Sequence, residues 1–252
     1  MATEQDDRLT VIVGLGGTGL SCAKYFAAQG EKFKIVDSRA EPPSLAVLQE
    51  LLPEVECELG EFSTETFLQA KQLVVSPGVS IRTKEIVAAK KAGIPITGDI
   101  DIFSQQVNAP IVAVTGSNGK STVVALLAEI FEQAGKEFGL GGNLDGENFK
   151  PALELLLEEK KDLYVLELSS FQLETTKSLN AEVASILNLS ADHMDRYESL
   201  DDYCRAKQRI FRGCKQAVIN RDDKNSYPLE SGDAVVWDFG FVIPTLCTCS
   251  EA

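Results

Sequence analysis

Residues 113–122, Ala-Val-Thr-Gly-Ser-Asn-Gly-Lys-Ser-Thr, constrain the fold of this chain more than any other segment. They follow the apolar run Ala109–Val114 and precede the amphipathic segment Val123–Ala134, so we expect a strand, a glycine-containing loop and a helix in that order. Glycines let backbone N–H groups converge on phosphate oxygens, and the first turn of the helix offers free N–H groups and the positive end of its dipole. The segment therefore predicts a nucleotide-phosphate loop.

Two side chains of this segment strengthen the prediction. Lys120 can add a mobile positive charge, and the hydroxyl of Ser121 can ligate Mg²⁺. The general pattern begins with a glycine where this chain has Val114, so Gly116 supplies an alternative flexible point. The competing interpretation is an ordinary turn with Lys120 on the first helical turn. The predicted loop residues are Gly116, Ser117, Asn118, Gly119, Lys120, Ser121 and Thr122.

Composition narrows the class of protein. The formal net charge of −14 over 252 residues argues against nucleic acid or an anionic membrane as the main partner. The start, MATEQDDRLT, is acidic and polar, unlike a signal peptide, and no apolar run reaches the roughly 18–20 residues that span a bilayer. Six scattered cysteines without a CxxC pair indicate free thiols. We therefore expect a cytoplasmic protein without membrane insertion, and a monomer.

Repeated strand–helix alternation predicts an α/β fold, with mostly parallel sheets and helices on both faces. We expect a Rossmann-like amino-terminal domain at residues 1–98 and a phosphate-loop-type α/β central domain at residues 99–240, connected through Asp99–Phe103. Besides the strand before the phosphate loop, the expected strands are Leu9–Val13, Phe33–Val36, Leu73–Val75, Gly93–Ile96, Leu163–Leu168, Ala184–Leu189 and Ala217–Asn220. The expected helices include one that ends near Gln29, and Ser44–Leu52, Lys84–Lys91 and Tyr203–Phe211.

A second glycine loop lies near the amino terminus. Gly14, Gly16 and Gly19 follow the first strand in the pattern G-x-G-x-x-G, and Asp37 ends the next strand. Such glycines allow a tight turn and the close approach of a pyrophosphate, and the acid can bond a ribose hydroxyl. A packing turn, a dinucleotide site and a site for another nucleotide diphosphate all fit this pattern. The run Asp37-Ser38-Arg39 also suits a uracil or ribose edge.

Three further side chains are candidates for chemistry. Glu167 sits within an apolar strand, where an unpaired carboxylate is costly, and a strand beside a phosphate loop commonly presents an acid to the nucleotide's Mg²⁺. His193, the only histidine, follows a strand within an Asp-rich loop. Lys207 lies in a helical stretch, where a solvated face is the default. The alternatives are a water-facing edge Glu and a surface or core His.

Three motifs together resemble the Mur ligases of peptidoglycan synthesis. They are Thr115-Gly116-Ser117-Asn118-Gly119-Lys120-Ser121-Thr122, Leu166-Glu167-Leu168-Ser169-Ser170-Phe171-Gln172-Leu173 and Asp192-His193-Met194-Asp195-Arg196-Tyr197. The last two, with Ser76-Pro77-Gly78 and Gly141-Gly142-Asn143, are most similar to the D-glutamate-adding branch of the family. The resemblance covers residues 8–239. It implies that the first glycine loop holds the uridine diphosphate of a sugar substrate and the second holds ATP.

The resemblance also implies a reaction. The γ-phosphoryl group of ATP moves to the alanine carboxylate of a UDP-N-acetylmuramoyl substrate, the amine of D-glutamate attacks the acyl phosphate, and phosphate leaves. Such phosphoryl transfer depends on positioning and on charge neutralisation. The implied partners are thus the sugar nucleotide, D-glutamate, ATP and Mg²⁺, and not nucleic acid.

Residue roles follow from the same resemblance. Lys120 contacts the phosphates, Ser121 and Glu167 hold the nucleotide's Mg²⁺, and His193 with a carbamylated Lys207 helps to hold a second Mg²⁺ near the acyl phosphate. The implied catalytic residues are Lys120, Glu167, His193 and Lys207. The implied metal ligands are Ser121, Glu167, His193 and Lys207. Gly14, Gly16 and Gly19 face the diphosphate. Asp37, Ser38 and Arg39 face the uracil, and Ser76, Pro77, Gly78 and Asn143 belong to the sugar-substrate site.

The chain departs from the family pattern in two places. Family members have a third α/β domain that closes over the site, and the similarity stops near Gly240, so we expect an incomplete central domain, an unrelated tail at residues 241–252 and no ligation by this chain alone. The loop Leu144–Lys150 is longer than usual. Two other functions stay open. A noncatalytic nucleotide-sugar-binding fragment fits the incomplete domain, and an NAD(P)-dependent oxidoreductase fits Gly14–Gly19 with Asp37.

Overall fold

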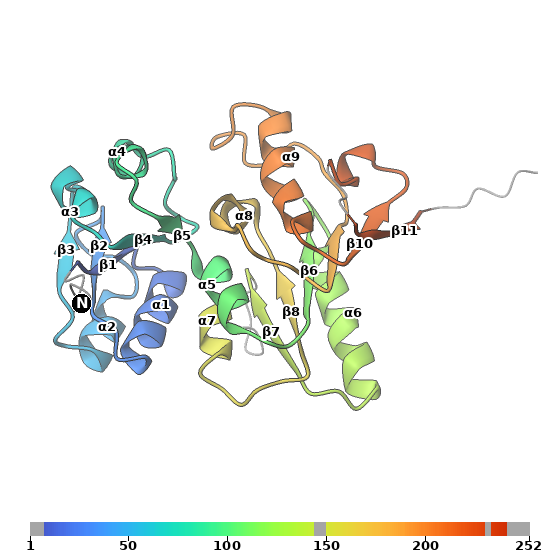
Figure 1. Cartoon of the computed structure of the whole chain (residues 1–252), viewed down its shortest axis with the longest axis horizontal. Coiled ribbons are helices and arrows are strands. Elements are labelled where there is room, and N and C mark those ends of the chain that lie inside the picture. Colours follow the sequence, from blue (N-terminus) through green and yellow to red (C-terminus); the bar gives the residue numbers. More distant parts are fainter. Residues whose placement is uncertain (1–7, 144–149, 230–232, 241–252) are drawn as a thin grey trace, which may run out of the picture.

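The computed structural model describes residues 8–143, 150–229 and 233–240, which form two parallel β-sheets with their helices (Figure 1). The predicted tail at 241–252 and most of the loop at 144–150 lie outside these residues. The amino-terminal sheet has five strands and the second sheet has six. All of their pairings are parallel. The predicted α/β class with parallel sheets is therefore confirmed.

The first sheet has the strand order β3-β2-β1-β4-β5, which is that of a Rossmann-type sheet. Alternate side chains of β1 enter two apolar clusters on opposite faces. Ile12 packs on the side of α1 and α2, and Val11 and Val13 pack on the side of α3 and α4. The elements are β1 Thr10–Val13, α1 Gly17–Ala28, β2 Phe33–Asp37, α2 Leu45–Leu51, β3 Cys57–Leu59, α3 Thr64–Leu68, β4 Gln72–Val75, α4 Lys84–Lys91 and β5 Ile96–Thr97.

The second sheet has the order β11-β10-β9-β6-β8-β7, with β6 between β8 and β9. Val114 of β6 packs with Val124 of α6 on one face, whereas Ala113 belongs to the cluster on the other face. The elements are α5 Asp99–Gln106, β6 Ile111–Thr115, α6 Lys120–Gln133, β7 Phe138–Gly142, α7 Ala152–Leu155, β8 Leu163–Glu167, α8 Ser170–Thr175, β9 Val183–Ile186, α9 Leu200–Gln208, the 3₁₀ turn η1 Arg209–Phe211, β10 Gln216–Asn220, the 3₁₀ turn η2 Lys224–Ser226 and β11 Val235–Phe239.

One apolar cluster continues from the first sheet into the second. It contains Phe26 of α1 together with Phe103 of α5 and Tyr164 of β8, whose rings meet edge to face with centroids 5.2 Å apart. At its border the Lys24 ammonium lies 3.1 Å from a Glu154 carboxylate oxygen. Helices α1, α5 and α7 accordingly lie side by side between the two sheets (Figure 1). This shared cluster fixes the two sheets against each other.

Several predicted elements need correction. The expected connector Asp99–Phe103 is the start of helix α5, because Asp99 and Asp101 place negative charge in its first turn. The expected strand Gly93–Ile96 is reduced to Ile96–Thr97, because Gly93 has a positive φ of 85° after α4. The expected strand Ala184–Leu189 ends at Ile186, and the helix Tyr203–Phe211 is α9 followed by η1.

Six further elements were not predicted from the sequence: β3, α3, β7, α7, α8 and β11. Strand β7 has the sequence Phe-Gly-Leu-Gly-Gly, and glycine has a low strand propensity. Its glycines are needed for contact with β8, because a Cβ on Gly142 would lie 2.1 Å from the backbone oxygen of Glu167. None of the helices in the described part of the chain is both long and apolar enough to cross a membrane.

Replacing Gly19 by alanine should lower the free energy of unfolding by about 3 kcal/mol. A Cβ at Gly19 would lie 1.9 Å from the backbone oxygen of Gly14, so the first glycine loop or helix α1 must shift. Gly17→Ala is the matched control, because Gly17 starts the same helix and a Cβ there meets open space. The control should change stability by no more than about 1 kcal/mol. Urea unfolding measures both, and equal effects would contradict the close approach.

Because of Asp99, the free energy of unfolding should fall as the pH rises from about 4 to about 6. Burial raises the pKa of this carboxyl to about 6, and Gln172 Nε2 donates to its Oδ2 at 3.2 Å. In the unfolded chain it ionises at its ordinary pKa of about 3.9. Between the two values the native state holds more protons, so each pH unit lowers the free energy of unfolding by about 1.4 kcal/mol.

The Asp99→Asn variant has no such proton to lose, so it should be more stable than the wild type above pH 6 by about 3 kcal/mol. Below pH 4 the two proteins should converge. Urea unfolding from about pH 3 to about pH 7.5 measures the difference, with the exposed Asp201→Asn as control. Parallel stability curves for wild type and Asp99→Asn would rule out the buried proton.

Candidate functional site

The predicted phosphate loop joins β6 to α6, as the sequence indicates. Gly119 caps the helix in the left-handed conformation, with φ 81°, which explains the glycine before Lys120. The Lys120 ammonium donates to the backbone oxygen of Ser117 at 3.2 Å, so it folds back over the loop. The first N–H groups of α6 have no partner within the helix, which is the arrangement that binds anions at helix N-termini.

Residues that follow β9 hold this loop in place. The Asn188 side chain accepts a hydrogen bond from the Asn118 N–H and donates to the Asn118 oxygen, both at 3.0 Å. The Asn188 backbone oxygen accepts from the Ser117 N–H at 2.9 Å. The Ser117 hydroxyl accepts from the Ser190 N–H and lies 3.0 Å from the Tyr203 hydroxyl. Sequence reasoning assigned no role to Asn188, although its position at the end of a strand beside β6 is the signal that could have found it.

Glu167 lies beside the phosphate loop, because β8 pairs with β6 in a register that aligns Glu167 with Val114. The Ser121 hydroxyl donates to Glu167 Oε2 at 2.9 Å. Burial raises the pKa of the Glu167 carboxyl, and the Ser121 hydrogen bond and the positive charges of Lys120 and Lys207 oppose that rise. Asn143, which follows β7, donates its N–H to the Glu167 backbone oxygen at 2.8 Å, and its side chain helps to lower the pKa of the Glu167 carboxyl.

Lys207 is buried beneath the loop, with 2% of its surface exposed, and not on a solvated helix face. Its ammonium donates to the Thr115 hydroxyl and to the Gly116 backbone oxygen, both at 3.0 Å. Burial and the positive charge of Lys120 lower the pKa of Lys207 to about 7. A substantial fraction of the amine is therefore neutral near pH 7, which is a condition for a lysine to react as a nucleophile.

His193 lies on the same edge of the sheet but is half exposed. Its backbone is left-handed, with φ 54°, and its ring lies tilted against that of Phe171, with centroids 4.9 Å apart. Within the described residues no hydrogen bond or ion pair joins it to Ser121, Glu167 or Lys207. The same residues contain no group of three or more His, Cys, Asp and Glu side chains that could hold a metal ion. Of the predicted metal ligands, only Ser121 and Glu167 are in direct contact.

The amino-terminal glycine loop is built around Asp37. Both oxygens of this buried carboxylate bind the Arg39 guanidinium, at 2.8 and 2.7 Å, and Oδ2 also accepts from the Leu15 N–H at 2.7 Å. Burial would raise the pKa of Asp37, but the hydrogen bonds from Arg39 and Leu15 hold it below its usual value. Gly16 caps α1, and the Ser76 hydroxyl donates to the Gly14 oxygen at 2.9 Å. Ser38 follows Asp37, and Pro77 and Gly78 follow Ser76 in the turn after β4.

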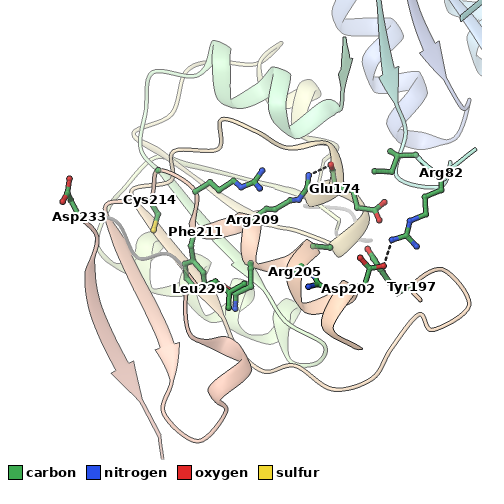
Figure 2. Close-up of a pocket in the computed structure, with 15 residues that line it drawn as sticks. Arg82, Glu174, Tyr197, Asp202, Arg205, Arg209, Phe211, Cys214, Leu229 and Asp233 are labelled. Atoms are coloured by element: carbon green, nitrogen blue, oxygen red, sulfur yellow. Dashed lines mark hydrogen bonds and ion pairs between the residues drawn. The ribbon is translucent and has the colours of Figure 1, made fainter. Parts of the chain in front are cut away.

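A cavity of about 660 Å³ lies beside α9 (Figure 2). Its lining includes Arg82 of the first unit, Glu174 of α8, and Asp202, Arg205 and Arg209. None of the phosphate-loop residues lines it, and neither do Glu167 and Lys207. The cavity therefore belongs to the junction between the two units and not to the phosphate site.

Fold and site together define a class: a nucleotide-binding α/β protein in which a Rossmann-type unit precedes a phosphate-loop unit. Comparison with known proteins specifies the family. The family model "Mur ligase MurD-like, N-terminal domain" matches residues 8–98, and the "Mur ligase middle domain" matches residues 114–242. The chain belongs to the Mur ligase family.

Curated relatives agree with this assignment. The chain is 48% identical over 244 residues to UDP-N-acetylmuramoylalanine–D-glutamate ligase of Pseudomonas aeruginosa. The matched region covers 97% of this chain and 53% of the relative. It is 53% identical over 214 residues to the ligase of the same name from Nitrosococcus oceani. This matched region covers 85% of the chain and 46% of the relative. The chain thus spans about half the length of the curated relatives it matches.

Solved structures share the fold. The UDP-N-acetylmuramate:L-alanyl-gamma-D-glutamyl-meso-diaminopimelate ligase from Neisseria meningitides superposes with a TM-score of 0.58 at 19% identity, over 92% of this chain and 77% of that one. A murein peptide ligase from Psychrobacter arcticus gives a TM-score of 0.52 at 19% identity, over 92% of this chain and 53% of that one.

Replacing Asn188 by alanine should lower the affinity for ATP–Mg²⁺ about thirtyfold, because two hydrogen bonds that hold Asn118 are lost, each worth about 1 kcal/mol. Amide exchange at residues 116–119 should become faster. Asn225→Ala, an exposed asparagine of η2, is the control and should change neither property. Calorimetric titration and hydrogen exchange give the two readouts. An unchanged affinity would show that the loop holds its shape without Asn188.

Proposed function

We propose that this chain provides the two nucleotide sites of an ATP-dependent ligase that adds D-glutamate to UDP-N-acetylmuramoyl-L-alanine through an acyl phosphate, in peptidoglycan synthesis. The observation that carries the proposal is the Ser121–Glu167 contact at a phosphate loop over buried Lys207. Relatives that bear the name of this ligase support the choice of substrates. The nucleotide substrates imply a cytoplasmic reaction.

ATP binds, in this proposal, at residues 116–122, where Lys120 and the helix N–H groups neutralise the phosphates. Ser121 and Glu167 present oxygen atoms, the donor type that Mg²⁺ prefers, and so they fit a nucleotide-bound Mg²⁺. When bound, the metal neutralises charge on the transferred phosphoryl group. The buried carboxylate and hydroxyl orient each other by their hydrogen bond, so the pair is preorganised.

Lys207 requires a modification to act as proposed. In its neutral form, the amine nitrogen attacks the carbon of CO₂. An N–C bond forms as one C–O π bond opens onto oxygen, and an N–H proton passes to water, which leaves the side chain as a carbamate anion. The lowered pKa of Lys207 supplies the neutral amine near pH 7. The carbamate and His193 would together hold a second Mg²⁺, which would neutralise charge on the acyl phosphate. Lys120, Glu167, His193 and Lys207 are the proposed catalytic residues.

The sugar nucleotide binds, in this proposal, at the first glycine loop. Gly14, Gly16 and Gly19 face its diphosphate. Asp37, Ser38 and Arg39 face the uracil, and Ser76, Pro77, Gly78 and Asn143 reach the sugar. The contact of Asn143 with Glu167 supports this direction of the substrate, because it links the sugar end to the phosphoryl-transfer site. We further propose domains at residues 1–98 and 99–240, because α5 packs on α7 and α8 of the second unit.

The oxidoreductase alternative is disfavoured by Asp37. Both of its carboxylate oxygens already bind Arg39, so the hydroxyls of an NAD ribose would have to compete with a bidentate guanidinium. The other alternative is a noncatalytic protein that binds the sugar nucleotide. We propose that the 252-residue chain binds both nucleotides but does not ligate by itself.

Titration of the chain with ATP–Mg²⁺, UDP-N-acetylmuramoyl-L-alanine and NADH tests the proposal. The first two should bind. Lys120→Ala should weaken ATP about tenfold to hundredfold, because a charge-assisted contact is worth about 1.5–3 kcal/mol, without affecting the sugar nucleotide. Lys136→Ala, beyond the other end of α6, is the control. NADH binding without sugar-nucleotide binding would contradict the ligase. Phosphate release that depends on both the sugar nucleotide and D-glutamate would contradict inactivity of the chain alone.

A further inference from the structure

Arg196 makes two side-chain hydrogen bonds from the second unit to the first, within the part of the chain that the structure describes. Its guanidinium donates to the backbone oxygens of Pro77 at 2.7 Å and Val79 at 3.1 Å, both in the turn after β4. It also donates to Glu174 Oε2 at 3.0 Å, and it lies 4.1 Å from the centroid of the Phe171 ring. The side chains of the Arg196–Glu174 pair are 13% and 7% exposed. One largely buried side chain of the second unit is thus fixed to the backbone of the first.

The guanidinium is held in place by its own unit. The N–H groups of Arg196 and Tyr197 donate to the His193 oxygen at 2.9 and 3.2 Å, which closes the turn that starts at left-handed His193. Glu174 and Phe171 both come from α8 and fix the guanidinium from two sides. Arginine is suited to this task because its planar group offers several donors in a rigid arrangement. The side chain therefore fixes the turn after β4 relative to α8, in addition to the charge that it contributes.

Hydrogen bonds and packing connect Arg196 to both glycine loops. In the first unit, Val79 and Ser76 pack directly on Gly14, and the Ser76 hydroxyl donates to the Gly14 oxygen. In the second unit, the loop that carries His193 also carries Ser190, whose backbone oxygen accepts from the Ser117 hydroxyl at 3.0 Å. A short path of contacts therefore runs from the first loop through Arg196 to the second.

Arg82 supplies a second, more exposed link. It donates to the Arg196 backbone oxygen at 3.2 Å and pairs with Asp202 of α9, next to the cavity of Figure 2. The side chain of Arg82 is 40% exposed, so solvent screens its ion pair. The two arginines thus reach across the junction in opposite directions. Arg196 is the buried member and should dominate.

We propose that Arg196 is a positioning residue that couples the sugar-nucleotide loop to the phosphate loop, so that binding of one nucleotide strengthens binding of the other. This inference rests on the proposed function, because it takes the two loops as sites for two substrates. Phosphoryl transfer needs the γ-phosphate and the substrate carboxylate at near-contact distance, and an error of about 1 Å can cost a hundredfold in rate. Arg196 acts through the turn and the loop, and it contacts neither substrate directly.

The test is a titration of the 252-residue chain with ATP–Mg²⁺, in the absence and presence of saturating UDP-N-acetylmuramoyl-L-alanine. For the wild type, the sugar nucleotide should tighten ATP binding at least about fivefold, the lower end of usual coupling between sites. The double variant Arg196→Gln/Glu174→Gln removes both buried charges together and leaves no unpaired ion. It should bind each nucleotide alone within about threefold of the wild type, and the coupling should fall to about onefold.

Two controls separate positioning from general loss of structure. Glu174→Gln alone removes the ion pair but keeps the donors to Pro77 and Val79, so coupling should persist. Arg221→Ala removes an exposed ion pair with Asp238 far from the junction and should also leave it unchanged. Without ligand, amide exchange at residues 78–83 should accelerate in the double variant but not in the controls. Thermal unfolding confirms that each variant is folded.

The outcomes are distinct. If the wild type binds neither nucleotide, the proposed function fails, and the exchange measurement still decides whether Arg196 holds the turn. If both bind and the double variant keeps the wild-type coupling, the role of Arg196 is overturned while the proposed function stands. Unchanged exchange at residues 78–83 would overturn it as well. Loss of coupling in Glu174→Gln to the same extent would assign the effect to the ion pair and would also overturn the role.

Discussion

The site depends on the parallel register of β6 with its two neighbours. Val114 aligns with Glu167 of β8 and with Ser185 of β9, so the three chain segments that follow these strands leave the sheet at one edge. One of them is the phosphate loop, one begins with the Glu167 carboxylate, and one carries Asn188 and His193. A shift of the register by one residue would turn Glu167 to the opposite face of the sheet. The geometry of the site is therefore a property of strand pairing.

The buried charges of this edge are balanced against one another. Burial disfavours both the Glu167 carboxylate and the Lys207 ammonium, and each favours the charged form of the other. Lys120 shifts the balance, because it favours the carboxylate and opposes the second ammonium. A carbamate at Lys207 would reverse the sign of one partner and place two anions in a site of low dielectric. Such an arrangement needs cations, which agrees with the proposed metal sites.

The sequence predicted the parts of the fold that depend on local pattern. The Lys120 loop and the α1 glycine loop follow apolar strands directly, and both lie where the pattern placed them. The burial of Lys207 could not be predicted from spacing, because a lysine on a polar helix is solvated by default and only tertiary contact with Thr115 buries it. Strand β7 was not predicted because glycine has a low strand propensity. Its glycines are required because β8 approaches too closely for a side chain. Arg196 lies in a motif and Asn188 lies before it, but neither contact could be predicted, because their partners are 119 and 70 residues away.

The junction combines two kinds of interaction with different consequences. The apolar cluster around Phe26, Phe103 and Tyr164 holds the two sheets together, but hydrophobic burial is not directional and tolerates small rotations. Hydrogen bonds require a donor and an acceptor within a few tenths of an ångström and within a limited angle. The contacts of Arg196 with Pro77 and Val79 lie at the end of the junction nearest the loops. The apolar cluster therefore holds the two units together, and the hydrogen bonds of Arg196 determine how their glycine loops are aligned.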